Sequence, residues 1–113
     1  MSEEKLYDLI QLNELSGGND DFVNKMVQMF IDLAPETLDN LNNGLAEGDL
    51  DRVGGAAHKI KPSLDMMGIV VLKEKIRTLE ANAKNRVNVD QIPALVEDVS
   101  STLKALIAQL RAR

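Results

Sequence analysis

The chain has 113 residues, a net charge of −5 at pH 7, no cysteine and a single histidine, His58. The length suits one domain, residues 1–113, and without cysteine the chain forms no disulfide and has almost no ligands for a zinc site. The negative charge argues against nucleic acid as a partner, because phosphate backbones are held chiefly by Lys and Arg.

The N-terminal sequence, MSEEKLYDL, has no basic region followed by an apolar core. We therefore expect no export signal and a cytoplasmic location. The longest nearly unbroken apolar run, Met66 to Leu72, is far shorter than the roughly 20 residues that span a bilayer. This argues against a membrane segment.

The first predicted element is a short amphipathic helix that caps a bundle and ends at Gly17 and Gly18, a pair suited to helix termination. Its apolar residues are Leu6, Leu9, Ile10, Leu12 and Leu15.

A long second helix is predicted from an N-cap at Asn19 or Asp20 to Gly48. Pro35 falls in its interior, where proline costs about 3 kcal/mol and usually kinks a helix. The apolar period continues across Pro35, so we expect one kinked helix and not two short ones. Its core-facing residues are Val23, Val27, Phe30, Ala34, Leu38, Leu41 and Leu45.

A second apolar stripe lies about a quarter turn from these residues on the same helix. It consists of Phe22, Met26, Met29 and Leu33. One interpretation is that the first helix covers the stripe. The other is that part of it docks a partner helix, since exposed apolar patches usually mark contacts.

The third predicted helix carries His58 on its outer side. Asp49 is a suitable N-cap, and Gly68 follows the last apolar residue. The core-facing residues are Leu50, Val53, Ala57, Ile60, Leu64 and Met67. At 3.6 residues per turn, His58 points roughly 130° away from the centre of that stripe. It shares the outer side with Asp51, Gly54, Gly55, Lys61, Pro62 and Asp65.

Two further helices complete the prediction. The fourth has its apolar face at Ile69, Leu72, Ile76, Leu79 and Ala83. The last has Asp90 as its N-cap, Pro93 in the first turn, and an apolar face at Ile92, Val96, Val99, Leu103, Leu106 and Leu110. Four long helices with short connections predict an all-α antiparallel four-helix bundle with a short additional N-terminal helix.

Charge is unevenly distributed along the chain. The segment from Arg52 to Arg77 has six Lys or Arg and two acidic residues, a balance of +4 that leaves −9 elsewhere. Because this basic segment contains His58, we expect an anionic ligand there.

Two consecutive glycines, Gly54 and Gly55, each cost roughly 1 kcal/mol relative to alanine within a helix. Close approach of another molecule beside His58 would account for them.

The run from His58 to Gly68 resembles the signature of the histidine-containing phosphotransfer (HPt) domain, His-x-Leu-Lys-Gly followed by a small residue and a closing glycine. The matching residues are His58, Ile60, Lys61, Ser63 and Gly68. The resemblance extends over nearly the whole chain through the spacing of Phe30, Pro35, Leu38, Leu41, Asp49 and Ala57.

This resemblance implies that the chain is a phosphorelay intermediate. His58 would accept a phosphoryl group from the aspartyl phosphate of a response-regulator receiver domain and pass it to the aspartate of another receiver domain. Lys61 would stabilise the charge of the phosphoryl group. A neutral imidazole, with a reference pKa of about 6.5, can be a nucleophile toward phosphorus without a separate base. The implied partners are receiver domains, which bring their own magnesium, and a hybrid sensor histidine kinase. The chain would work as a monomer without a cofactor. We expect receivers to dock over the outer side of the second helix and on Gly54, Gly55, Lys59, Pro62 and Asp65.

Two positions depart from the family pattern. Pro62 replaces the usual glycine, and we expect a bend just beyond His58 because proline cannot donate to the carbonyl four residues earlier. Asp65 replaces a small residue and lies one turn after Lys61, so the two are predicted to pair. That pair would compete with a phosphoryl group for Lys61.

Other functions remain open at this point. His58 alone could be an ordinary surface histidine, and Lys61 part of a solvated face. The chain could be a non-catalytic helical adaptor. An acyl-carrier bundle would need a serine at a helix start, but Ser63 lies inside a predicted helix. No glycine-rich phosphate-binding loop is present, so autonomous kinase activity is not expected.

Overall fold

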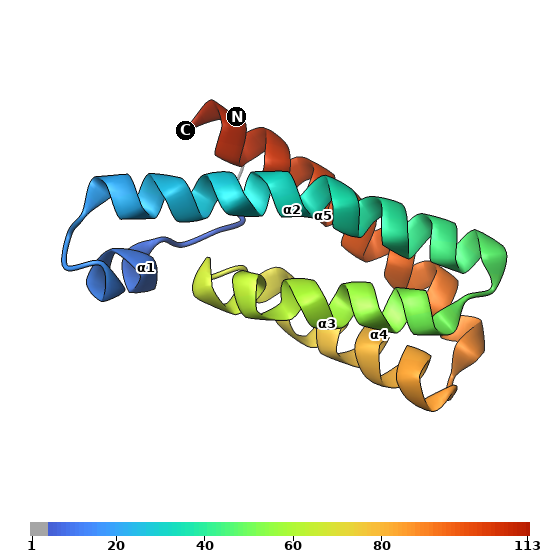
Figure 1. Cartoon of the computed structure of the whole chain (residues 1–113). Coiled ribbons are helices and arrows are strands. Elements are labelled where there is room, and N and C mark those ends of the chain that lie inside the picture. Colours follow the sequence, from blue (N-terminus) through green and yellow to red (C-terminus); the bar gives the residue numbers. More distant parts are fainter. Residues whose placement is uncertain (1–4) are drawn as a thin grey trace.

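The structure is a computed structural model that describes residues 5–113, and its elements are helical (Figure 1). They are α1 (Ile10–Leu15), α2 (Asp20–Glu47), α3 (Leu50–Met66), the 3-10 turn η1 (Val70–Leu72), α4 (Lys73–Asn85), the 3-10 turn η2 (Val89–Gln91) and α5 (Ile92–Ala112). The four long helices form an antiparallel bundle in which α2 packs on α5 and α3 packs on α4. The short α1 is the additional N-terminal helix. The predicted all-α fold is confirmed.

Helix ends follow the local sequence where capping residues are present. The side chain of Asn19 accepts a hydrogen bond from the Phe22 amide at 3.1 Å, and that of Asp49 accepts one from the Arg52 amide at 3.0 Å. Gly48 ends α2 with a φ of 70°, a conformation that glycine adopts without a Cβ penalty. These contacts confirm the predicted starts of α2 and α3.

Both internal prolines are accommodated within helices. α2 runs without a break through Pro35, which confirms one helix and not two, and α3 continues through Pro62 to Met66. The bend expected beyond His58 stays a prediction.

The prediction for the start of α5 was wrong. Asp90 lies within η2, and the N-cap of α5 is Gln91, whose side chain makes no capping bond. Asn88 has a φ of 48° and turns the chain. Asp90 therefore lies in the 3-10 turn that precedes the helix. Pro93 occupies the first turn of α5, as predicted, where its missing amide proton is tolerated.

The N-terminal segment also differs from the expectation. Helix α1 begins only at Ile10, and two backbone amides before it are bound to other parts of the chain: Leu6 N donates to Gln109 Oε1 at 2.8 Å, and Asp8 N donates to the Met67 carbonyl at 2.9 Å. The preceding residues therefore tie this segment to α5 and to the end of α3. Gly17 and Gly18 end the region with positive φ, as expected.

The apolar faces of the long helices meet in one core. The predicted core-facing residues of the third helix that are buried are Val53, Ala57, Ile60, Leu64 and Met67. Leu38, Leu45 and Leu50 lie partly buried at the edge of the core. Burial of these stripes fixes the rotation of α3 about its axis, and so decides which side chains face outward. No helix of residues 5–113 has the length and apolar character needed to span a membrane.

Candidate functional site

His58 lies on the outer side of α3, as its position off the apolar stripe predicts. Its neighbours Ala57 and Ile60 are fully buried, whereas 64% of the His58 side chain is exposed. The helix thus presents the imidazole to solvent from the middle of a rigid, packed element.

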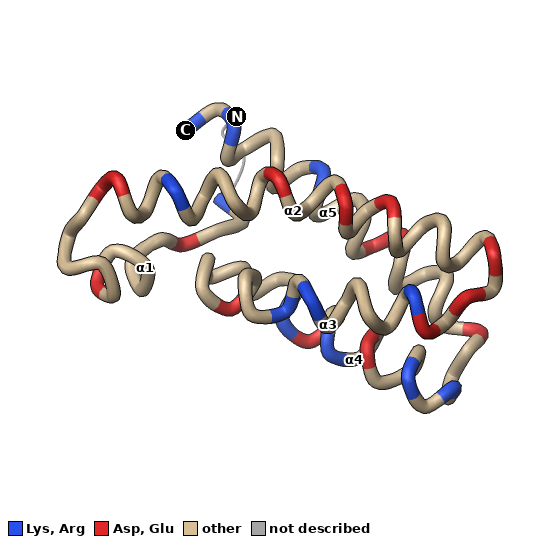
Figure 2. The backbone as a smooth tube through the Cα atoms, in the orientation of Figure 1, with Lys and Arg blue, Asp and Glu red and all other residues tan. Residues whose placement is uncertain are grey.

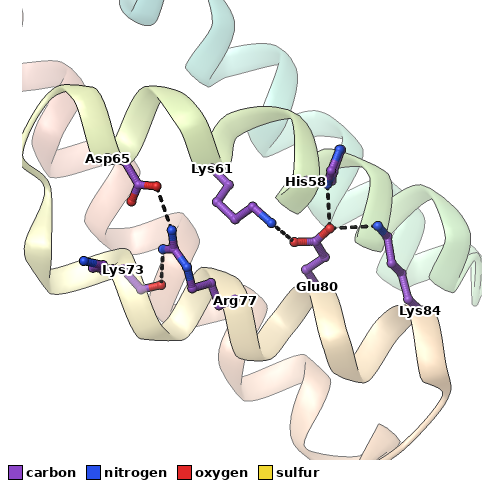
Figure 3. A network of polar contacts seen from close by, with 7 residues as sticks. All are labelled: His58, Lys61, Asp65, Lys73, Arg77, Glu80 and Lys84. Atoms are coloured by element: carbon purple, nitrogen blue, oxygen red, sulfur yellow. Dashed lines mark hydrogen bonds and ion pairs between the residues drawn. The ribbon is translucent and has the colours of Figure 1, made fainter.

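A buried carboxylate from α4 holds the imidazole ring. Glu80 Oε2 lies 2.7 Å from His58 Nδ1, and only 10% of the Glu80 side chain is exposed (Figure 3). Lys61 Nζ donates to Glu80 Oε1 at 2.7 Å, and Lys84 Nζ donates to Oε2 at 2.8 Å. One carboxylate therefore connects the histidine to two ammonium groups, one on each helix.

These contacts define the protonation of the site. The hydrogen bonds from Lys61 and then Lys84 lower the pKa of Glu80 to about 2, with a smaller contribution from His58, although burial opposes the shift. Glu80 is therefore ionised near neutral pH and can only accept hydrogen bonds. A neutral His58 must then carry its proton on Nδ1, which leaves the lone pair on Nε2. That arrangement suits a nucleophile.

The predicted pair between Lys61 and Asp65 is wrong. Asp65 Oδ2 accepts from Arg77 Nη2 at 2.6 Å, and this hydrogen bond is the main cause of the lowered pKa of Asp65. Lys61 binds Glu80 instead. The reason is that α4 packs along this side of α3 and brings Arg77 and Glu80 within reach, so pairs between helices replace the pair within one helix. Asp65 does not occupy the amine of Lys61.

The two glycines beside His58 have different surroundings. Gly54 is buried, and a Cβ placed on it would lie 3.3 Å from Lys84 Cγ and 3.4 Å from Ala83 Cβ. A Cβ on Gly55 would meet nothing within 4 Å. The sequence placed both glycines on the outer side, which is wrong for Gly54: it allows close packing of α3 on α4. Gly55 alone faces open space.

The other predicted docking residues, Lys59 and Pro62, are exposed. Lys59 Nζ lies 3.4 Å from Glu36 Oε1 of α2. Beside Lys59 an apolar groove runs between α2 and α3, and it is lined by Met26, Met29, Phe30, Leu33, Lys59, Ser63, Met66 and Met67. Met29 is 55% exposed, so α1 does not cover this part of the second stripe.

The charge distribution sets this face apart from the rest of the bundle. Figure 2 shows more Lys and Arg on α3 and α4 than on α2, which is mainly acidic. Among residues 5–113 no group of three or more His, Cys, Asp or Glu side chains is arranged to hold a metal ion.

Sequence reasoning missed Glu80 and Lys84. Glu80 lies next to the core residue Leu79, and Lys84 follows the core residue Ala83. Their spacing of four residues was a visible signal, but such pairs are common on helix surfaces. Nothing in the spacing indicates that this pair faces His58, which is 22 residues away from Glu80.

Comparison with known proteins identifies the family of this fold. Residues 25–113 match the model of the Hpt domain. The crystal structure of histidine-containing phosphotransfer protein B from Pseudomonas aeruginosa PAO1 superposes with a TM-score of 0.82 at 24% identity, covering 97% of this chain and 95% of that one. A comparison with curated proteins gives no match.

Proposed function

The chain belongs to the Hpt domain family and has a histidine phosphotransfer function in two-component phosphorelays; we propose that His58 is the residue that carries the phosphoryl group. The observation that supports this most directly is the 2.7 Å contact between His58 Nδ1 and the carboxylate of Glu80. It orients the ring and leaves the lone pair on Nε2, in an exposed side chain that a partner can reach. A nucleophile held by a second group in this way is a common arrangement in covalent catalysis.

In the proposed uptake step, the Nε2 lone pair attacks the phosphorus of an aspartyl phosphate on a receiver domain. The bond from phosphorus to the aspartate oxygen breaks in line with the attack, and its electron pair returns to that carboxylate. Lys61 and Lys84, each bound to Glu80, supply positive charge beside the phosphoryl oxygens. A second receiver aspartate then takes the phosphoryl group by the reverse reaction.

The proposed docking surface combines open backbone and apolar contact. Gly55 exposes backbone of α3 without a side chain close to His58. The groove between α2 and α3, which Met29 lines, provides apolar surface. Lys59 lines this groove, and Pro62 and Asp65 are exposed elsewhere on α3. Exposed apolar surface with a charged surround is typical of a protein interface.

The proposal includes what the partners bring. The receivers would supply the aspartate and the magnesium ion, and a hybrid sensor histidine kinase would supply the phosphoryl group. This chain would act in the cytoplasm as a monomer, with no cofactor, nucleic acid or membrane as a partner.

The test is intact mass after incubation with phosphoramidate, which donates phosphate without a protein partner, and then with phosphorylated receiver domains and magnesium. We expect one added phosphate that is labile in acid, stable in base and absent from His58→Gln. Phosphate on His58→Gln would refute the assignment of the site. Receiver binding that survives His58→Ala, with no phosphate taken up from any donor, would select the adaptor instead.

A further inference from the structure

Building on the proposed phosphotransfer at His58, we infer that Glu80 keeps the proton on Nδ1 through both transfer steps, so that the phosphoryl group always leaves from a protonated ring. Glu80 is then a positioning residue that also sets the reactivity of the phosphohistidine. The relay would need no proton transfer at the ring.

The first step leaves the ring positively charged. When Nε2 forms its bond to phosphorus, the bond from phosphorus to the aspartate oxygen breaks and the receiver regains a carboxylate. The ring keeps its hydrogen on Nδ1 and becomes a cation joined to a phosphoryl dianion. No proton is gained or lost, and all electrons are accounted for.

The second step depends on that proton. A receiver carboxylate attacks phosphorus, the bond between Nε2 and phosphorus breaks, and its electron pair returns to Nε2. If Nδ1 still carries hydrogen, the leaving group is neutral imidazole. If Nδ1 has lost it, the leaving group is the imidazolate anion, a far stronger base and therefore a much poorer leaving group.

The geometry around Nδ1 opposes loss of the proton. Glu80 Oε2 lies 2.7 Å from Nδ1, and a deprotonated nitrogen would direct its lone pair at those of a carboxylate at that distance. The protonated ring instead donates a charge-assisted hydrogen bond to a carboxylate that is 10% exposed. That hydrogen bond is lost if the ring gives up its proton.

Other charges face this region from three helices. Lys61 of α3 and Lys84 of α4 oppose a positive ring, but each binds an oxygen of Glu80. Lys59 of α3 is paired with Glu36 of α2. Glu80 is the group in direct contact with the ring, and removing its charge leaves two ammonium groups that disfavour the protonated ring. Loss of the Glu80 carboxylate and repulsion from the two remaining lysines thus both disfavour the protonated ring.

The experiment follows the phosphohistidine by phosphorus NMR across a pH titration after loading with phosphoramidate. We expect the wild-type ring to lose its proton about one pH unit or more above Glu80→Gln, a tenfold difference in proton affinity. Dephosphorylation of the wild type should accordingly stay fast to higher pH, and Glu80→Asp should restore part of the difference. Asp51→Asn is the matched control: it also removes one acid that pairs between α3 and the end of α4, because Asp51 Oδ1 lies 3.3 Å from Arg86 Nη2.

Equal midpoints in wild type and Glu80→Gln would overturn the inference while leaving the proposed function intact. A wild-type midpoint equal to that of phosphohistidine in an unstructured peptide would overturn it without any variant. Wild-type protein that takes up no phosphate on His58 would overturn the proposed function, and the inference with it.

Discussion

The two glycines beside His58 are adjacent in sequence, yet alanine should affect them in opposite ways. Gly55→Ala replaces glycine with alanine at an exposed position in a helix interior, where the new Cβ meets nothing within 4 Å. The helix propensity difference is about 0.8–1.0 kcal/mol in favour of alanine. We therefore expect Gly55→Ala to raise the free energy of unfolding by about 1 kcal/mol, a gain of roughly 4 °C in Tm.

Gly54→Ala gains the same propensity but meets α4. Its Cβ would lie 3.3 Å from Lys84 Cγ and 3.4 Å from Ala83 Cβ. Overpacking of this kind costs about 1–3 kcal/mol, and the lower end applies because a lysine side chain can shift by a few tenths of an ångström. The gain and the cost then nearly cancel. Gly54→Ala should be about 1 kcal/mol less stable than Gly55→Ala.

Urea denaturation followed by circular dichroism measures the difference in the free energy of unfolding between the two alanine variants. Assays with receiver domains test the functional role of Gly55. A Gly54→Ala protein as stable as Gly55→Ala would refute the packing role assigned to Gly54. Gly55→Gln adds bulk to the proposed docking surface, so phosphate uptake from a receiver should fall about tenfold more than uptake from phosphoramidate. Equal effects on both donors would remove Gly55 from the docking surface.

Three further predictions concern the charged groups around the site. Lys61→Ala should slow uptake from phosphoramidate by about tenfold or more, since it removes the less exposed of the two ammonium groups that bind Glu80; a mass time course at the wild-type rate would contradict this. Folding lowers the pKa of Glu80 from 4.5 to about 2, so its stabilisation is present above pH 4.5 and is lost as the pH falls toward 2. Because Lys84 is half exposed, we expect this loss in the free energy of unfolding to be about 1–2 kcal/mol. Urea denaturation at both ends of this pH range should show a smaller loss for Glu80→Gln than for the wild type. Equal losses in the two proteins would exclude a contribution from Glu80. Asp65→Ser should cost less than about 1 kcal/mol in the same assay, because its pair with Arg77 lies at the surface; a loss above about 2 kcal/mol would show a structural role.

Helix positions and the outward direction of His58 were predictable from the sequence because they depend on local rules. The caps at Asn19 and Asp49 act on amides three residues away, and Gly48 ends α2 through its own backbone conformation. The phase of the apolar stripe determines the rotation of α3 about its axis, and this exposes His58.

The surroundings of His58 depended on the tertiary structure. Glu80 and Lys84 reach the histidine because α4 packs against α3 at one particular height and rotation. The same contact buries Gly54 and leaves Gly55 open. Local spacing carries no information on how far one helix slides along another, so the pairs between α3 and α4 could not be read from it. The sequence alone therefore located the proposed nucleophile, while the packing of two helices decided which groups contact it and supply charge beside it.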